Sequence, residues 1–181
     1  MLRLDPIEAV YAFVERAYVR LQAEEMLIRC LEEDNSAALQ HWVEGLLLAG
    51  PQSLVAIREI LAEVGDRKAQ AMKTMWQISR DFEGRLEGFG FQFGGLRKST
   101  WLAEVTPGKF SAMLEEQGVL DEQARQDCLL HLDEAREQLT NTFTHLGLLD
   151  EIQGYLEDWL WGLVYQSAHQ EQAEAFRTLQ A

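Results

Sequence analysis

Residues 6–33 read PIEAVYAFVERAYVRLQAEEMLIRCLEE, and the spacing of their apolar side chains indicates the fold class. These side chains recur at steps of three and one, the period of one helical stripe. The stripe consists of Ile7, Val10, Tyr11, Val14, Ala17, Tyr18 and Leu21. Asp5, Pro6 and Glu8 make a typical helix start, with a side-chain cap and a proline in the first turn. The stretch predicts an amphipathic helix from Pro6 to about Glu33.

The same period continues through the next third of the chain. After the polar break at residues 34–36, a second helix is expected to end at Gly50-Pro51. An apolar stripe then runs from Ser53 to about residue 87. Within it, Gly65-Asp66 offers a C-terminal glycine followed by a new N-cap, so we expect two helices there. Five glycines between residues 84 and 95 are expected to end the helix in a loop.

The second half of the chain also has helical signals. Thr106-Pro107 predicts a short helix that ends at Gly118, and Asp121 is the expected cap of a longer one. Gly147 is expected to stop that longer helix. Asp150 with Gln153 would then cap a last helix, whose residues 152–165 are apolar on nearly every face.

These patterns predict an all-α fold. We expect a single-domain bundle over residues 1–181, with about six to eight helices and a Gly/Phe-rich central loop at 84–98, where any subdivision would fall. Cys30 and Cys128 lie inside apolar helical patterns, which favours buried, reduced thiols and a cytoplasmic location. No apolar run approaches the roughly 18 residues that a membrane helix needs, so no membrane segment is expected.

The charge of the chain argues against one class of ligand. Asp and Glu number 30 against 16 Lys and Arg, a formal net charge of -14 at pH 7. This field repels the phosphate backbone of nucleic acids, so no direct nucleic-acid binding is expected. The acids are concentrated after Ser99, so a basic partner would meet the C-terminal half.

Motifs for chemistry are weak. The segment GFQFGGLRKS at 90–99 resembles a phosphate-binding loop only in its glycines, because Leu96 stands where the lysine is needed and no strand precedes it. Two His-to-Glu pairs are spaced by one helical turn, and a cysteine lies near the second. The residues to suspect in any metal site are His41, Glu44, Cys128, His131 and Glu134. They lack the further ligands of a structural or di-iron site, so we expect no metal, no cofactor and no catalytic triad.

Aromatic residues give the candidate partner-binding residues. Phe89, Phe91 and Phe93 alternate with small or polar residues, and Arg97 with Lys98 would add a basic rim. In the competing interpretation the three rings plug the end of the bundle. Trp159 and Trp161 cannot both face the same way on one helix, so one of them is expected to meet a neighbouring subunit, a partner or a loop.

The sequence therefore favours a non-enzymatic protein-protein interaction protein, such as an adaptor, assembly factor or regulator, and a two-fold homodimer formed through residues 152–165. A first alternative is a helical protein that binds a metal, cofactor or small molecule, with a redox role. A second is an acidic mimic of nucleic acid that occupies a basic groove on another protein.

Overall fold

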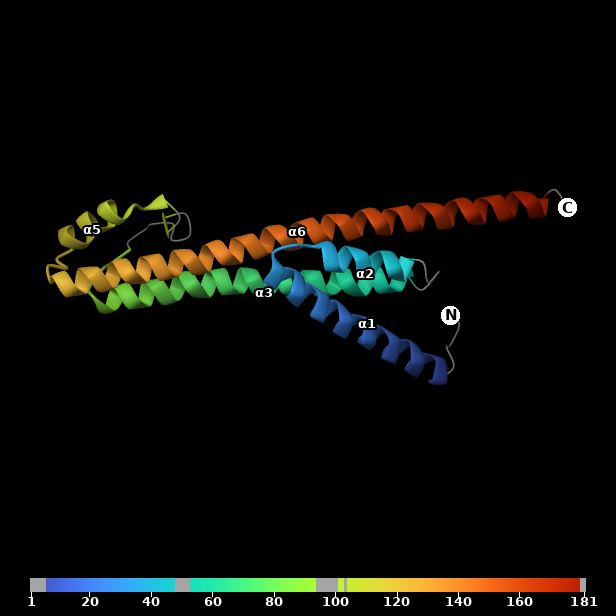
Figure 1. Cartoon of the computed structure of the whole chain (residues 1–181), viewed down its shortest axis with the longest axis horizontal. Coiled ribbons are helices and arrows are strands. Elements are labelled where there is room, and N and C mark those ends of the chain that lie inside the picture. The colour runs from blue at the N-terminus through green and yellow to red at the C-terminus, as the bar shows by residue number, and fades with distance from the viewer. Residues whose placement is uncertain (1–5, 48–52, 94–100, 103, 180–181) are drawn as a thin grey trace. The chain divides into compact units, whose positions relative to one another are not determined.

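The computed structural model describes residues 6–47, 53–93, 101–102 and 104–179. Five helices have defined bounds within these ranges: α1 (Pro6–Glu33), α2 (Ala37–Leu47), α3 (Ser53–Gly88), α5 (Pro107–Glu116) and α6 (Glu122–Leu179) (Figure 1). No strand occurs among the described residues. The all-α prediction is confirmed, and so are the predicted bounds of α1.

The expected six to eight helices are not found in the described part of the chain, because two predicted breaks are absent. Gly65 lies inside α3 and Gly147 inside α6. A helical glycine costs only about 1 kcal/mol relative to alanine. A buried side chain next to each glycine offsets that cost, Val64 before Gly65 and Leu148 after Gly147. Packing therefore decides the length of these helices.

The four predicted helix caps have different outcomes. Thr106 Oγ1 accepts a hydrogen bond from the Lys109 amide at 3.2 Å, and Asp121 Oδ2 accepts one from the Ala124 amide at 2.8 Å, so both of these caps are confirmed. Asp150 is not a cap, because it lies inside α6 and its carboxylate pairs with Lys68. The predicted cap Asp5 lies outside the described residues.

The contacts divide the chain into two compact units. Unit 1 contains residues 1–68 and 147–181, and unit 2 contains residues 69–146. Each unit has its own apolar core. The expectation of a single domain stays a prediction.

The core of unit 1 joins the second half of α1 to α2, α3 and α6. Its buried members are Ala23, Leu27, Cys30, Leu39, Val43, Ile57, Ile60, Val64, Leu148, Leu149, Ile152 and Leu156. The turn between α1 and α2 is held by polar contacts, since the Asn35 side chain accepts from the Ala37 amide and Ser36 donates to Glu151 at 2.8 Å. These contacts fix the second half of α1 in unit 1.

The core of unit 2 is rich in aromatic rings. α3 ends at Gly88, and the described part of the Gly/Phe-rich segment, residues 89–93, turns at Gly90, whose φ of 87° suits a glycine. Phe82, Phe91, Phe93 and Phe110 are buried. Their centroids lie 5.0–6.3 Å apart in the closest pairs, at the tilted and edge-on angles that aromatic pairs favour.

Among the described residues, no helix combines the length and the apolar character required to cross a membrane.

Candidate functional site

Helix α1 carries apolar side chains on two opposite sides. One side faces the core of unit 1 through Ala23, Leu27 and Cys30, all fully buried. At about 3.6 residues per turn, a second set lies on the other side of the helix. We call this set the outward face, and its members are Ile7, Val10, Tyr11, Val14, Tyr18 and Leu21. It is the stripe that the sequence pattern identifies, and it does not face the core.

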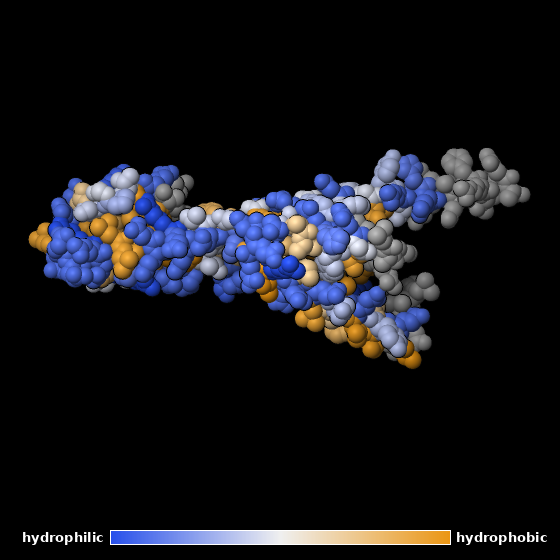
Figure 2. Space-filling model, in the orientation of Figure 1, coloured by the Kyte–Doolittle hydropathy of each residue, from blue (hydrophilic) through white to orange (hydrophobic). Residues whose placement is uncertain are grey.

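The outward face is open to solvent. Its six side chains are between 57% and 73% exposed, and Phe13 at its edge is 73% exposed. Figure 2 shows the resulting band of apolar surface along α1, at the lower right of the view. Apolar patches larger than a few hundred Å2 are rare on monomeric proteins and typically mark interaction sites.

The first half of α1 has almost no tertiary support. From Ile7 to Tyr18 every residue is exposed except Ala12, which is half-buried. Short isolated helices are marginal in water, and this segment is rich in β-branched and aromatic residues, which are only moderate helix formers. A helix of this composition gains most of its stability from packing, and the described residues of the chain supply little packing here.

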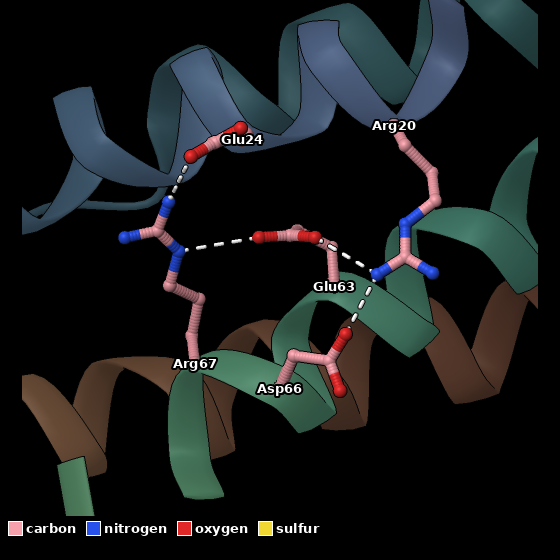
Figure 3. A network of polar contacts seen from close by, with 5 residues as sticks. All are labelled: Arg20, Glu24, Glu63, Asp66 and Arg67. Atoms are coloured by element: carbon pink, nitrogen blue, oxygen red, sulfur yellow. Dashed lines mark hydrogen bonds and ion pairs between the residues drawn. The ribbon is translucent and has the colours of Figure 1, made fainter. Parts of the chain in front are cut away.

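An ion-pair network fixes the rotation of α1 about its axis (Figure 3). Arg20 donates to Glu63 at 3.0 Å and to Asp66 at 2.7 Å, while Arg67 donates to Glu63 at 3.2 Å and to Glu24 at 2.9 Å. Glu63 links the two arginines, and its side chain is only 14% exposed. The hydrogen bonds to Glu63 and then to Asp66 raise the pKa of Arg20. Because the network joins one flank of α1 to α3, it keeps the outward face turned away from unit 1's core.

A groove lies on the other flank of the first half of α1, with about 670 Å3 of empty space that includes open solvent. Its walls come from α1, α2 and the start of α3. The lining residues are Ala12, Glu15, Arg16, Val19, Leu46, Ser53, Val55, Ala56 and Glu59.

The phenylalanines predicted to bind a partner lie largely in the core of unit 2. Phe91 is fully buried, Phe93 is nearly so, and Phe89 is half-buried against the same core. This burial favours the competing interpretation, in which the rings are a structural plug, because a buried ring has no area left to offer a partner. The predicted basic rim, Arg97 and Lys98, lies outside the described residues.

The two predicted tryptophans differ in environment. Trp159 packs its ring against Tyr155, with the centroids 6.4 Å apart. Trp161 points to another side of α6 and is 72% exposed. Val164 and Tyr165, one turn further along the same side, are also exposed. These three residues form a second, smaller apolar surface in unit 1.

The five residues suspected of metal binding are not brought together. His41 and Glu44 are exposed on α2 in unit 1, whereas Cys128, His131 and Glu134 belong to unit 2. Across the described ranges, no group of three or more His, Cys, Asp or Glu side chains could hold a metal ion.

Within unit 2, His131 and Glu134 belong to a small polar cluster with Arg85. Arg85 donates to Glu134 at 3.0 Å, and His131 Nδ1 lies 3.3 Å from the same carboxylate. The hydrogen bond with His131, helped by Arg85, lowers the pKa of Glu134. Burial raises the pKa of the nearby Cys128 thiol to about 11, so the thiol is protonated at neutral pH.

The outward face of α1 was missed as a site by sequence reasoning. The signal was present, because residues 19–30 carry a second apolar set, Val19, Ala23, Leu27 and Cys30, on the side opposite the first. A helix with two opposed apolar stripes needs two surfaces to bury them, and packing against a single bundle face buries only one stripe. Comparison with known protein families, curated proteins and solved structures finds no match to this chain.

Proposed function

We propose that this chain is a non-enzymatic interaction protein, an adaptor, assembly factor or regulator, that binds a protein through the outward face of α1. The observation that carries the proposal is the exposure of six large apolar side chains in register on one helix face. Tyrosine is enriched among residues that dominate binding energies, and Tyr11 and Tyr18 lie in the middle of this face.

The charge of the chain supports a protein partner over a nucleic acid. A net charge of -14 disfavours phosphate backbones, and the outward face itself carries no charged side chain. An apolar helix face is recognised by another apolar helix or groove, through anchors spaced at one and two turns.

Site-specific photocrosslinking in cells of the native host tests the proposal. A photoreactive phenylalanine analogue replaces Tyr11 or Tyr18 in the full chain, and the matched control carries it at Gln123, an exposed position of α6 in unit 2. We expect a protein adduct from Tyr11 and Tyr18 and none from Gln123. The absence of any protein adduct at both tyrosines would contradict the proposed function.

A further inference from the structure

We propose that the outward face of α1 binds the outward face of a second copy of this chain, with the two α1 helices antiparallel across a two-fold axis near Val14. This inference rests on the proposed function, because it names the partner for the same surface.

The exposed area is the first argument. Six side chains that are 57% to 73% exposed present roughly 800 Å2, which is about what each partner contributes to a standard protein-protein interface. One outward face can therefore be covered by one helix of equal length, and a second α1 is such a helix.

The spacing of the face is the second argument. Ile7, Val14 and Leu21 follow one another at steps of seven, and all three are exposed. A seven-residue apolar repeat is the pattern with which one helix packs against another like it. A two-fold interface must be complementary to itself, and an uncharged apolar seam meets that condition even in a chain of charge -14.

The charge also sets the orientation. The second half of α1 is attached to the acidic body of unit 1 through Ala23, Leu27 and Cys30, whereas the side chains of the first half are mostly exposed. In a parallel pair the two acidic bodies would lie side by side and repel each other. In an antiparallel pair they lie at opposite ends, the exposed first half of each α1 packs on the other helix, and Ile7 meets Leu21 of the partner subunit.

The mass of the purified full chain in solution tests the inference. Light scattering at tens of micromolar, a concentration at which ordinary dimers persist, should give twice 20.7 kDa. The variant Tyr11→Ser/Val14→Thr/Tyr18→Ser should dissociate at least tenfold more readily, with lower helix content in circular dichroism. The control Glu8→Gln/Glu15→Gln, on the same half of α1, should stay dimeric. A retained cooperative unfolding transition shows that the triple variant is folded.

Cysteine crosslinking tests the orientation in the same preparation. Cys30 and Cys128 are buried, so new cysteines on the outward face react without competition from them. When Ile7→Cys and Leu21→Cys chains with different tags are mixed, we expect mixed disulfides to dominate. Disulfides between two Ile7→Cys chains would instead indicate the parallel pair and overturn the proposed arrangement.

The outcomes separate this inference from the proposed function. A monomeric wild-type chain whose Tyr11 photo-adduct contains a different protein would overturn the second copy and leave the function standing. A photo-adduct of twice the chain mass would support both.

Discussion

Two segments, residues 89–110 in unit 2 and the first half of α1 in unit 1, leave their phenylalanine and tyrosine rings in opposite environments. In unit 2 the segment 89–93 and α5 return over α3 and α6, and they bury the rings of Phe91, Phe93 and Phe110. In unit 1 no described segment returns over the first half of α1. The rings left exposed on that half of α1 are Tyr11, Phe13 and Tyr18. Outside these two segments each unit also has exposed rings, such as Trp161 in unit 1 and Trp76 in unit 2. The comparison teaches that an aromatic residue's role depends on whether the chain folds back to cover it.

The largest expected effect tests the buried side of this comparison. Phe91→Ala removes a fully buried ring from unit 2 and should lower the free energy of unfolding by about 3–5 kcal/mol. Phe13→Ala, at an exposed position of unit 1, is the matched control and should change it by less than about 0.5 kcal/mol. Urea denaturation of both variants measures the difference. Equal losses would mean that Phe13 is covered as Phe91 is.

The two buried cysteines allow the burial in the two cores to be compared, because Cys30 lies in the core of unit 1 and Cys128 in that of unit 2. Burial raises both pKa values, that of Cys128 to about 11 from 9.0. The unfolded thiols therefore lose their protons first, and stability falls as pH rises from about 9 toward 11. For Cys128 the loss is on the order of 2 kcal/mol.

Thermal melts between pH 7 and pH 11 measure this loss. The fall should be shallower in Cys128→Ala, once that variant's own cost at pH 7 is subtracted. Rapid labelling of either native thiol at pH 7.5 would show that its core is open.

Substitutions in the ion-pair network test how much the network contributes to holding α1 in unit 1. Glu63→Gln weakens the links to Arg20 and Arg67 and should cost about 1 kcal/mol at low salt, since a shared and largely buried carboxylate contributes more than an exposed pair. Asp66→Asn, at a 73% exposed side chain, should cost less than half as much. Unfolding midpoints at low salt and in 1 M NaCl measure both variants. A Glu63→Gln effect that persists unchanged in 1 M salt would argue against an ionic origin.

The smallest effects concern the helix starts. Asp121→Ala removes the cap of α6 in unit 2 and should cost about 0.5–1 kcal/mol. Asp150→Ala, inside the same helix in unit 1, loses only an ion pair with Lys68 and should cost a few tenths of a kcal/mol. The measurement is the loss of unfolding free energy in each variant relative to the unchanged chain. A larger loss in Asp150→Ala would mean that α6 is interrupted near Gly147.

The sequence-based prediction was right where the structure depends only on residues close together in the chain. The bounds of α1, the caps Thr106 and Asp121, and the turn at Gly118 follow from side-chain and backbone preferences within a few residues. The helices through Gly65 and Gly147 were mispredicted, because core packing distant in sequence outweighs a glycine's small cost. The outward face was recognised as a stripe but not as a surface, since periodicity gives the face of a helix and not what covers it.

The chain order of the units has a consequence for how this protein can be altered. Every core residue of unit 1 precedes Ala69 or follows Leu146, and Lys68 donates to Gln153 at 2.8 Å, so α3 and α6 contact each other within unit 1 close to both sequence boundaries of unit 2. Unit 2 is thus an insertion within the sequence of unit 1. Excising it and joining the two edges with a short turn leaves the core of unit 1 and the outward face of α1 complete. Exchanging the coding sequence for residues 69–146 would therefore replace unit 2 while the sequence of unit 1 stays unchanged.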